Sequence, residues 1–292
     1  MAIALWRALF LFPVVLLAAS ILEAELKDKT AKDFDRYVRE TERRLDSRDQ
    51  PFLYVDGLAS GEKTKALEAL QKGEPVIAKL TTTEGKKEIE IDDGLVHHWV
   101  GVVFVRGKSV AQAVALLQDY DRHQAIYKPN VDRSKTLSRD GDRFKVFLRF
   151  HMKKGVTAVV NSDHDAVFTR DASDRASSRI RSTRIQEVEE PGTPKEREKP
   201  VGKDHGFLWR LNSYWRFLER DGGVYVQCES VTLTRGIPWG FGMAVKPFVT
   251  AIPEETLKFT LTKTREELDR RTKQAATARP AEARLYASRR TP

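Results

Sequence analysis

Histidine and acidic side chains occur together at two places in this chain where they could bind a metal or transfer a proton. His97 and His98 are neighbours in an apolar segment that reads as a strand, so their side chains point to opposite faces and cannot bind one ion. We interpret them as one surface and one packed histidine. In a second segment Asp163 and Asp165 share one face while His164 lies on the other, with no second His or Cys at ligand spacing. This pattern favours a polar strand over a metal site.

Glu229 is the single charged residue of the predicted strand 224–234. Pairing with the preceding strand places it beside Tyr214 and diagonal to Arg216, where a cross-strand charge pair explains it. A register shifted by one would instead turn Glu229 inward, as a polar anchor for a ligand or as a base. Arg149 alternates with the apolar residues of its own strand and is predicted to point outward.

The remaining motifs indicate no hydrolase. No histidine is paired with a recognisable nucleophile, and Cys228, the only cysteine, is best interpreted as a small core residue that forms no intrachain disulfide. Arg179, Arg181 and Thr183 share one strand face, which is either solvated or a binding spot for an acidic headgroup. We therefore assign no catalytic residue, no metal and no cofactor.

A glycine-rich segment between Ile237 and Phe248 carries Trp239, Phe241 and Met243. Such a segment presents a large apolar surface on a flexible backbone. It is either a packed amphipathic turn, or a gate or membrane-touching lip at the mouth of a cavity.

This glycine-rich segment follows a predicted hairpin and precedes a predicted helix. The strand 207–219 alternates with period two, the strand 224–234 is rich in β-branched residues, and the turn falls at 220–223. In that register Trp215 and Phe217 align with Val226 and Cys228. Pro253 then begins an amphipathic helix that ends at Arg271 and carries an apolar stripe: Leu257, Phe259, Leu261, Thr264 and Leu268.

The stretch NSYWRFLERDGGVYVQCESVTLTRGIPWGFG followed by IPEETLKFTLTKTREEL resembles the end of the START-like helix-grip domains, the group that includes the polyketide cyclases. The resemblance implies an α+β fold in which a curved antiparallel sheet of about seven strands wraps around the C-terminal helix. It also implies that a ligand lies between this sheet and the helix. The residues expected to bind it are Trp209, Leu211, Trp215, Phe217, Val226, Trp239, Phe241, Met243, Leu257 and Leu261.

The order of elements upstream is consistent with this resemblance. The predicted domain spans 94–272: it begins with a strand at 94–106 and continues with a helix capped by Ser109 and a second short helix at 119–127. Four strands follow, at 131–137, 144–152, 157–169 and 177–188. Residues 189–206 are rich in proline, glycine and charge and are predicted to form a mobile loop.

The remaining parts of the chain are an N-terminal extension at 23–93 and a basic, flexible tail at 273–292. The extension contains a predicted helix at 25–46 with apolar residues at helical spacing, and a short helix at 62–71. Segments 75–80 and 87–91 could pair as a short hairpin around Glu84-Gly85.

Residues 1–22 are typical of an export signal or an N-terminal anchor. Arg7 is followed by an apolar run of about a dozen residues, shorter than the ~20 that span a membrane. We expect an exported protein in the periplasm or at the cell envelope. The net charge of +9, from 51 Lys and Arg against 42 Asp and Glu, therefore indicates a solvated surface or weak contact with anionic lipid, and no nucleic acid.

Three hypotheses for function follow. The first is an exported START-like protein that binds a hydrophobic or lipid-type small molecule. The second is an enzyme of the cyclase or dehydratase kind, for which Glu229 and His151 are the candidate ionisable groups. The third is a structural or interaction protein of the cell envelope that uses helix 25–46 and the tail as contact surfaces. The absence of a catalytic motif favours a binding protein over an enzyme.

Overall fold

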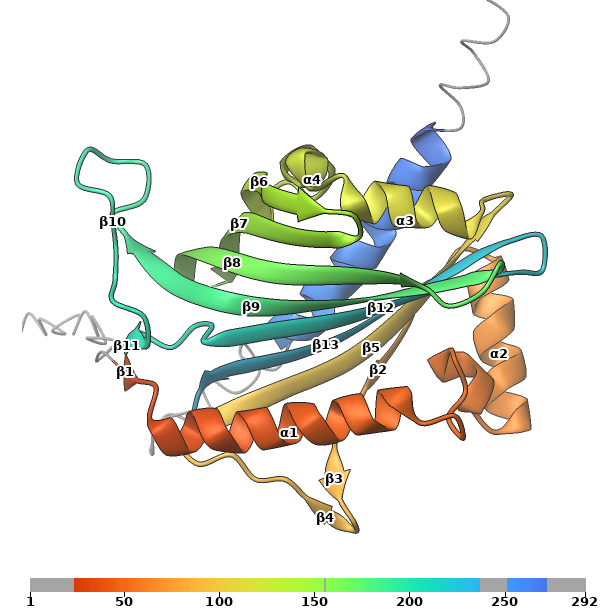
Figure 1. The fold of residues 1–292 in the computed structure, drawn as a ribbon, viewed down its shortest axis with the longest axis horizontal. Coiled ribbons are helices and arrows are strands. Elements are labelled where there is room, and N and C mark those ends of the chain that lie inside the picture. Colours follow the sequence, from red (N-terminus) through yellow and green to blue (C-terminus); the bar gives the residue numbers. More distant parts are fainter. Residues whose placement is uncertain (1–23, 155, 237–250, 272–292) are drawn as a thin grey trace, which may run out of the picture.

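The computed structural model describes residues 24–154, 156–236 and 251–271, and its main element is one antiparallel sheet (Figure 1). Within these residues the strand order is β2-β5-β13-β12-β9-β8-β7-β6, and β10 pairs with β9. The strands are β2 (Val76–Lys79), β5 (Gly94–Arg106), β6 (Val131–Asp140), β7 (Arg143–Lys154), β8 (Val156–Arg170), β9 (Arg175–Glu189), β10 (Arg197–Glu198), β12 (Arg210–Arg220) and β13 (Gly223–Arg235). Two small pairs lie outside the sheet: β1 (Ala24–Glu25) with β11 (Lys203–Asp204), and β3 (Thr83–Glu84) with β4 (Lys87–Glu88).

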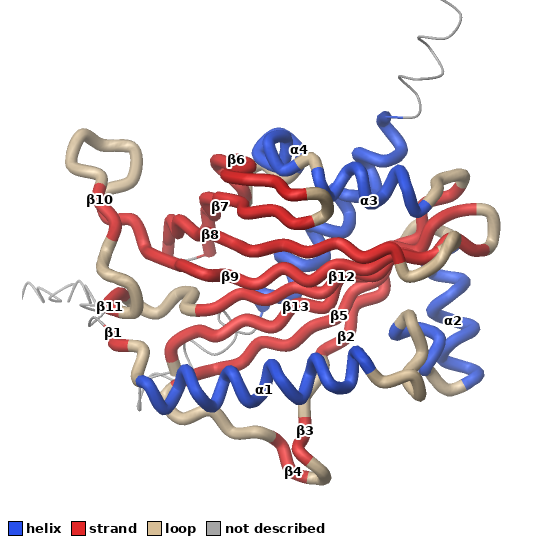
Figure 2. The backbone as a smooth tube through the Cα atoms, viewed as in Figure 1, coloured by secondary structure: helices blue, strands red, loops and turns tan. Residues whose placement is uncertain are grey.

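Helices cover both faces of the sheet, whose strands form one continuous layer (Figure 2). The helices are α1 (Asp28–Asp46), η1 (Tyr54–Gly57), α2 (Ser60–Gln71), α3 (Val110–Gln118), η2 (Tyr120–Arg122), α4 (His123–Ile126) and the C-terminal helix at residues 251–271. Ser109 caps α3 as predicted: its Oγ accepts from the Gln112 N–H, and Gln112 Oε1 accepts from the Ser109 N–H.

The C-terminal helix and α3 lie on the inner face of the sheet, where Trp215 and Phe217 pack against Leu257 and Leu261. We call the opposite side, covered by α1, η1 and α2, the outer face. Figure 1 shows the C-terminal helix on the far side of the sheet. The sheet is thus buried on both faces over much of its width, which explains why β5 is apolar along nearly its whole length.

The hairpin of β12 and β13 has the predicted register. Asp221 and Gly222 form the two-residue turn with φ values of 57° and 73°. Asp-Gly suits this turn because both central positions require positive φ, which glycine adopts freely and aspartate tolerates. The predicted partners are confirmed: Trp215 lies opposite Cys228, and Phe217 lies opposite Val226.

The predicted strands and helices are present, and the sheet is wider than the seven strands expected. Within the described residues it has nine, because β2 pairs with β5 and β10 pairs with β9. The predicted pairing of 75–80 with 87–91 is therefore wrong: β2 is an edge strand of the main sheet, and β4 pairs with β3. The reason for this pairing is burial: without β2, the apolar strand β5 would have an unpaired edge. No helix within the described ranges is long and apolar enough to cross a membrane.

The segment 189–206, predicted as a loop without regular structure, contains β10 and β11. Carboxylates of this segment contact polar side chains on the outer face of the sheet. Glu196 accepts two hydrogen bonds from the Arg149 guanidinium, at 2.7 and 2.9 Å, and Glu198 accepts from Asn161 Nδ2 at 2.8 Å. Arg149 does point away from the apolar side of its strand, as predicted, but this segment covers it and leaves it only 4% exposed.

Candidate ligand-binding face

The structure brings half of the predicted binding residues together on the inner face. Trp215, Phe217, Val226, Leu257 and Leu261 belong to one buried cluster between the sheet and the C-terminal helix. Trp239, Phe241 and Met243 lie outside the described residues, so the proposed gate stays a prediction.

The two remaining predicted residues lie outside this cluster. Leu211 is half-buried beside a separate apolar group of Val160, Ile185 and Leu208. Trp209 does not share the face of Trp215: it packs with the α1 cluster on the outer side, and its Nε1 donates to Asp204 Oδ1 at 2.9 Å. Strand alternation predicted an inward side chain for Trp209, but β12 starts only at Arg210, so the alternation does not apply to Trp209.

The C-terminal helix is held closely against the sheet at Gly101. A Cβ atom at this position would lie 2.4 Å from Leu261 Cδ1 and 2.6 Å from Ile77 Cδ1, so only glycine lets the helix approach this far. Further along, Tyr127 Oη and Thr264 Oγ1 are hydrogen-bonded at 2.9 Å, and Arg271 donates to Asp119 Oδ2 at 2.7 Å. The portion of the helix from Leu257 onward is therefore firmly packed.

Next to this packed region the inner face is less buried and more polar. Cross-strand pairing places His97 opposite Thr232, Thr232 opposite Leu211, and Ser182 opposite His164, so these residues form one row across five strands. The Leu211 N–H donates to Ser182 Oγ at 3.0 Å, which joins the two halves of the row. Many inner-face side chains here are half-buried and several carry hydroxyls: Trp99, Leu148, Phe150, Met152, Ile180, Ser182, Leu211, Ser213, Ser230 and Thr232. This part of the sheet offers apolar area and hydrogen-bonding groups side by side.

Four buried polar atoms of the described residues on this side of the sheet have no hydrogen-bond partner: Tyr120 Oη, His123 Nε2, His164 Nδ1 and Ser178 Oγ. Ser178 lies between Phe168 and Trp215 on the neighbouring strands, and Tyr120 packs against Phe144 with ring centroids 5.4 Å apart. Burial raises the pKa of Tyr120 and of the Cys228 thiol, so both stay protonated at neutral pH. Buried unpaired polar atoms cost stability, and a bound molecule is one way to offset that cost.

Burial has the opposite effect on the inner-face histidines. It lowers the pKa of His97 to about 4, helped by the charge of Lys79, and lowers the pKa of His164 to about 4 against the attraction of Asp163 and Asp165. Both rings are therefore neutral at pH 7. The prediction of one surface and one packed histidine at 97–98 is wrong, because the two side chains are 6% and 1% exposed. The two side chains do lie on opposite faces, and each is buried on its own face, His98 beneath α1 and His97 beside Thr234.

Glu229 lies on the outer face beneath α1. Its pairing with Tyr214 confirms the predicted register and excludes the register shifted by one. Glu229 Oε1 lies 2.8 Å from His98 Nε2 and also accepts a hydrogen bond from Arg44 of α1. Burial opposes ionisation of Glu229, but the hydrogen bond from His98 and the charges of Arg44 and Arg216 outweigh it and hold its pKa below the ordinary value.

The other sequence candidates are also outer-face residues with partners. His151 is partly exposed, with Nδ1 3.4 Å from Asp132 Oδ2. Arg179 and Arg181, interpreted as a solvated face or a headgroup site, instead form ion pairs with two α1 carboxylates, Asp46 and Glu42. Asp163 pairs with Arg184 at 2.7 Å and Asp165 with Lys145 at 3.0 Å, as a polar strand requires. Within the described ranges no three metal-ligating side chains cluster.

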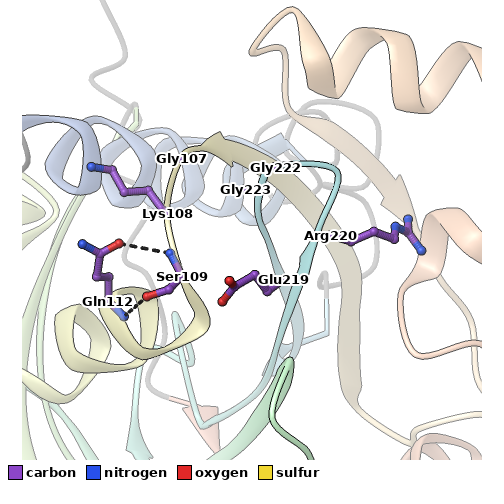
Figure 3. A pocket seen from close by; sticks show the side chains of 8 residues that line it. All are labelled: Gly107, Lys108, Ser109, Gln112, Glu219, Arg220, Gly222 and Gly223. Atoms are coloured by element: carbon purple, nitrogen blue, oxygen red, sulfur yellow. Dashed lines mark hydrogen bonds between the residues drawn. The ribbon is translucent and has the colours of Figure 1, made fainter.

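Two surface hollows lie away from these residues. The first, of about 440 Å³, is lined by residues of the β12–β13 turn and of the segment that leads into α3 (Figure 3). Glu219 Oε2 already accepts from the Val110 N–H at 3.0 Å there, so the start of α3 is occupied by a side chain of the protein. The second, of about 400 Å³, lies beside Gln118, Asp121 and Arg139. Neither is lined by a residue predicted to bind a ligand.

Sequence reasoning missed Tyr120, His164 and Ser178 as inner-face polar groups. Strand alternation in β8 carried a usable signal for His164, because Ala166 and Phe168 follow it at period two on the apolar face. The signal for Ser178 was similar, since Ala176 and Ile180 flank it. For Tyr120 no local pattern existed, because its ring enters the core from a short helix.

Similarity to known proteins is found among solved structures. No family model and no curated protein matches the chain. The matching solved structures include a STAR-related lipid transfer protein from Xanthomonas axonopodis (17% identity, TM-score 0.41, covering 65% of this chain and 98% of that one). They also include the Zhui aromatase/cyclase from a Streptomyces species (15%, 0.42, 61% and 96%) and a START superfamily protein from Mycobacterium smegmatis (11%, 0.39, 59% and 97%). These are likenesses of fold at low identity, and the α+β architecture described above follows from this chain's own sheet and helices.

Proposed function

We propose that this protein binds a hydrophobic, lipid-type small molecule on the inner face of its sheet, next to the C-terminal helix. The observation that carries the proposal is the division of this face. One region, around Phe217 and Leu261, is apolar and fully packed, and the adjoining region is half-buried with hydroxyl and imidazole groups. An amphipathic molecule requires this combination: apolar area for its body and a few hydrogen-bonding groups for its polar end.

Affinity would come mainly from apolar burial, at about 25 cal/mol per Å² of area removed from water. The half-buried residues Trp99, Phe150, Met152 and Leu211 supply that area without disturbing the packed core. No catalytic acid or base is needed for binding of this kind.

The test is a matched pair of variants and one apolar probe. The full chain is purified and examined by native mass spectrometry for a retained small molecule, and N-phenyl-1-naphthylamine is then titrated by fluorescence. Leu211→Glu places a charge in the half-buried region and should weaken probe binding roughly tenfold or more, equivalent to about 1.4 kcal/mol.

Leu137→Glu is the control, because Leu137 is 51% exposed on β6 and adds the same charge at an open site. It should leave probe affinity unchanged. A protein that retains nothing and does not bind the probe would contradict the proposal, as would equal losses in the two variants.

The two alternatives receive less support from the geometry. The cyclase or dehydratase hypothesis named Glu229 and His151, and both lie on the outer face, away from the region where a ligand would bind. The envelope scaffold hypothesis named the helix 25–46 as a contact surface. The apolar side of that helix packs on this chain's own sheet through Phe34 and Tyr37, and the tail lies outside the described residues.

The proposal includes export to the periplasm or cell envelope, supported by the apolar run that follows Arg7. Contact with an anionic membrane surface remains part of this proposal, on the basis of the net charge of +9. Cell fractionation with N-terminal sequencing of the recovered protein tests both a cleaved signal and an uncleaved anchor. Recovery of the chain from the cytoplasm with Met1 intact would contradict export.

A further inference from the structure

His164 is a buried ionisable group of the inner face with one ring nitrogen that has no hydrogen-bond partner. Its side chain is 2% exposed, and its ring meets Phe150 edge-on with centroids 6.2 Å apart and planes at 89°. Nε2 lies 2.8 Å from Ser162 Oγ, whereas Nδ1 is buried and has no partner. The ring is thus held firmly on one side and left unsatisfied on the other.

The neighbouring hydrogen bonds identify which ring nitrogen carries the proton. Ser162 Oγ donates its single proton to the Leu148 carbonyl at 3.0 Å, because a carbonyl can only accept. Ser162 must then accept from His164, so the proton is on Nε2. Nδ1 is left as an unprotonated nitrogen with a lone pair. Since burial keeps the ring neutral at pH 7, Nδ1 acts there as a hydrogen-bond acceptor.

A hydrogen-bond donor is also available directly across from this acceptor. Ser182 lies opposite His164 on β9, and its Oγ accepts from the Leu211 N–H at 3.0 Å. The pairing register shifts between Asp163 and His164, which leaves Thr183 as an extra residue in β9. A bulge of this kind re-aims neighbouring side chains and is common beside binding sites. Ser182 is half-buried, so its own side chain remains accessible in part.

We propose that His164 Nδ1 and Ser182 Oγ form a recognition site for a hydroxyl group of the bound molecule. The ligand hydroxyl donates to Nδ1 and accepts from the Ser182 hydroxyl, which uses both functions of an O–H group. The ligand class is therefore an apolar alcohol or phenol, in preference to a ketone, an ether or a hydrocarbon. This inference rests on the proposed function, because it assigns the polar end of the molecule held on the inner face.

Two probes of nearly equal size separate this inference from the proposed function: 2-naphthol and 2-methoxynaphthalene, which lacks the O–H donor. The dissociation constant of each is measured by fluorescence titration with the full chain. The unmodified protein should prefer the naphthol roughly fivefold, the size of one net hydrogen bond between neutral groups. His164→Leu should remove this preference and leave the affinity for the ether unchanged. Ser182→Ala removes a donor that the oxygen of either probe can accept from, so it should weaken the binding of both probes and leave the preference largely in place.

His151→Leu is the control. His151 lies on the outer side of β7, the strand paired with β8, so this variant should retain the full preference. Unchanged affinity for the ether in His164→Leu shows that this variant is folded. If both probes bind the unmodified protein equally, or His164→Leu keeps the preference, the inference is overturned while the proposed function stands. If neither probe binds, both are overturned.

A second measurement does not depend on any variant. The ¹⁵N NMR signals of the histidine rings should show Nε2 protonated and Nδ1 unprotonated at position 164 in the free protein. The Nδ1 signal should shift on addition of 2-naphthol and stay in place on addition of the ether. A proton on Nδ1 in the free protein, or an equal response to the two probes, would overturn the assignment. An Nδ1 signal that is already typical of a hydrogen-bonded acceptor in the free protein would also overturn it, because it would indicate that only an ordered water occupies the site.

Discussion

His98 and His164 are almost equally buried, at 1% and 2% exposure, on opposite faces of one sheet, and they have very different surroundings. On the outer face both ring nitrogens of His98 are paired. Nε2 lies 2.8 Å from Oε1 of the ionised Glu229, Nδ1 lies 2.9 Å from the Tyr37 hydroxyl, and that hydroxyl accepts from the Thr82 N–H at 2.8 Å. On the inner face His164 Nδ1 has no partner.

The difference separates a structural polar group from a group available for binding. A buried network whose members are all satisfied specifies one arrangement of the elements that contribute to it, here α1 on β5 and β13. A buried polar atom without a partner costs free energy in the unbound protein, and such costs are tolerated where function requires the group. The two histidines therefore predict opposite responses to the same substitution.

The largest effect is expected for His98→Leu. It leaves the Glu229 carboxylate and the Tyr37 hydroxyl without their buried partner, which should lower the free energy of unfolding by about 3 kcal/mol. Urea denaturation of the variant and the unmodified protein measures this loss. His151→Leu is the matched control on the outer surface and should change stability by less than about 1 kcal/mol. Equal effects for these two variants would show that the network around Glu229 is not stabilising.

Gly101→Ala tests the packed region of the inner face. The added Cβ would lie 2.4 Å from Leu261 Cδ1 in a core without space, so the substitution should destabilise by about 2 kcal/mol. In a Leu261→Ala background the nearest obstructing atom is gone while Ile77 Cδ1, at 2.6 Å, remains, so the cost of the added methyl group should fall in part. A double-mutant cycle in urea measures this coupling. Additive effects would mean that the helix does not contact the sheet at Gly101.

His164→Leu should slightly stabilise the unbound protein, by about 1 kcal/mol, because it removes an unpaired buried polar atom and supplies a side chain of similar volume. Ser162 keeps its hydrogen bond to the Leu148 carbonyl. The midpoint of urea denaturation measures the change. A loss of stability comparable to that of His98→Leu would eliminate the proposed contrast between the two faces.

A further effect concerns pH. Burial lowers the pKa of His164 to about 4, whereas a histidine in the unfolded chain has a pKa of about 6.5. Between these values the unfolded state binds more protons, so the stability contribution of the neutral ring is present above about pH 6.5 and is lost as the pH falls toward 4. His164→Leu should make the decline of stability over this window shallower.

Urea midpoints at pH 6.5 and 4.5 measure this slope. The pKa of Asp204, raised to about 6 mainly by burial, acts in the opposite direction, but it is common to both proteins and cancels in the comparison. His97 and His123 contribute in the same direction as His164 and likewise cancel. An identical slope in the two proteins would mean that His164 is not buried in its neutral form.

Local patterns were sufficient to predict most individual elements. The alternation around Trp215, the Asp221-Gly222 turn and the apolar stripe of α1 each depend on residues close together in the chain. For that reason the α+β class, the helix-grip order and the β12–β13 register could be predicted. The predicted position of Trp209 failed at a strand boundary, where alternation ceases to constrain the side chain.

The surroundings of each face depended on contacts between distant segments. Arg149 points outward by alternation, but the burial of its side chain depends on Glu196, which returns from a segment with no periodic pattern. The same applies to the two adjacent histidines, since α1 covers His98 and the inner face holds His97. Which buried polar groups find a partner is set by the register and bulge of β8 and β9. The sequence by itself therefore determined the elements and their order, and only the tertiary structure decided that His98 is satisfied and His164 is not.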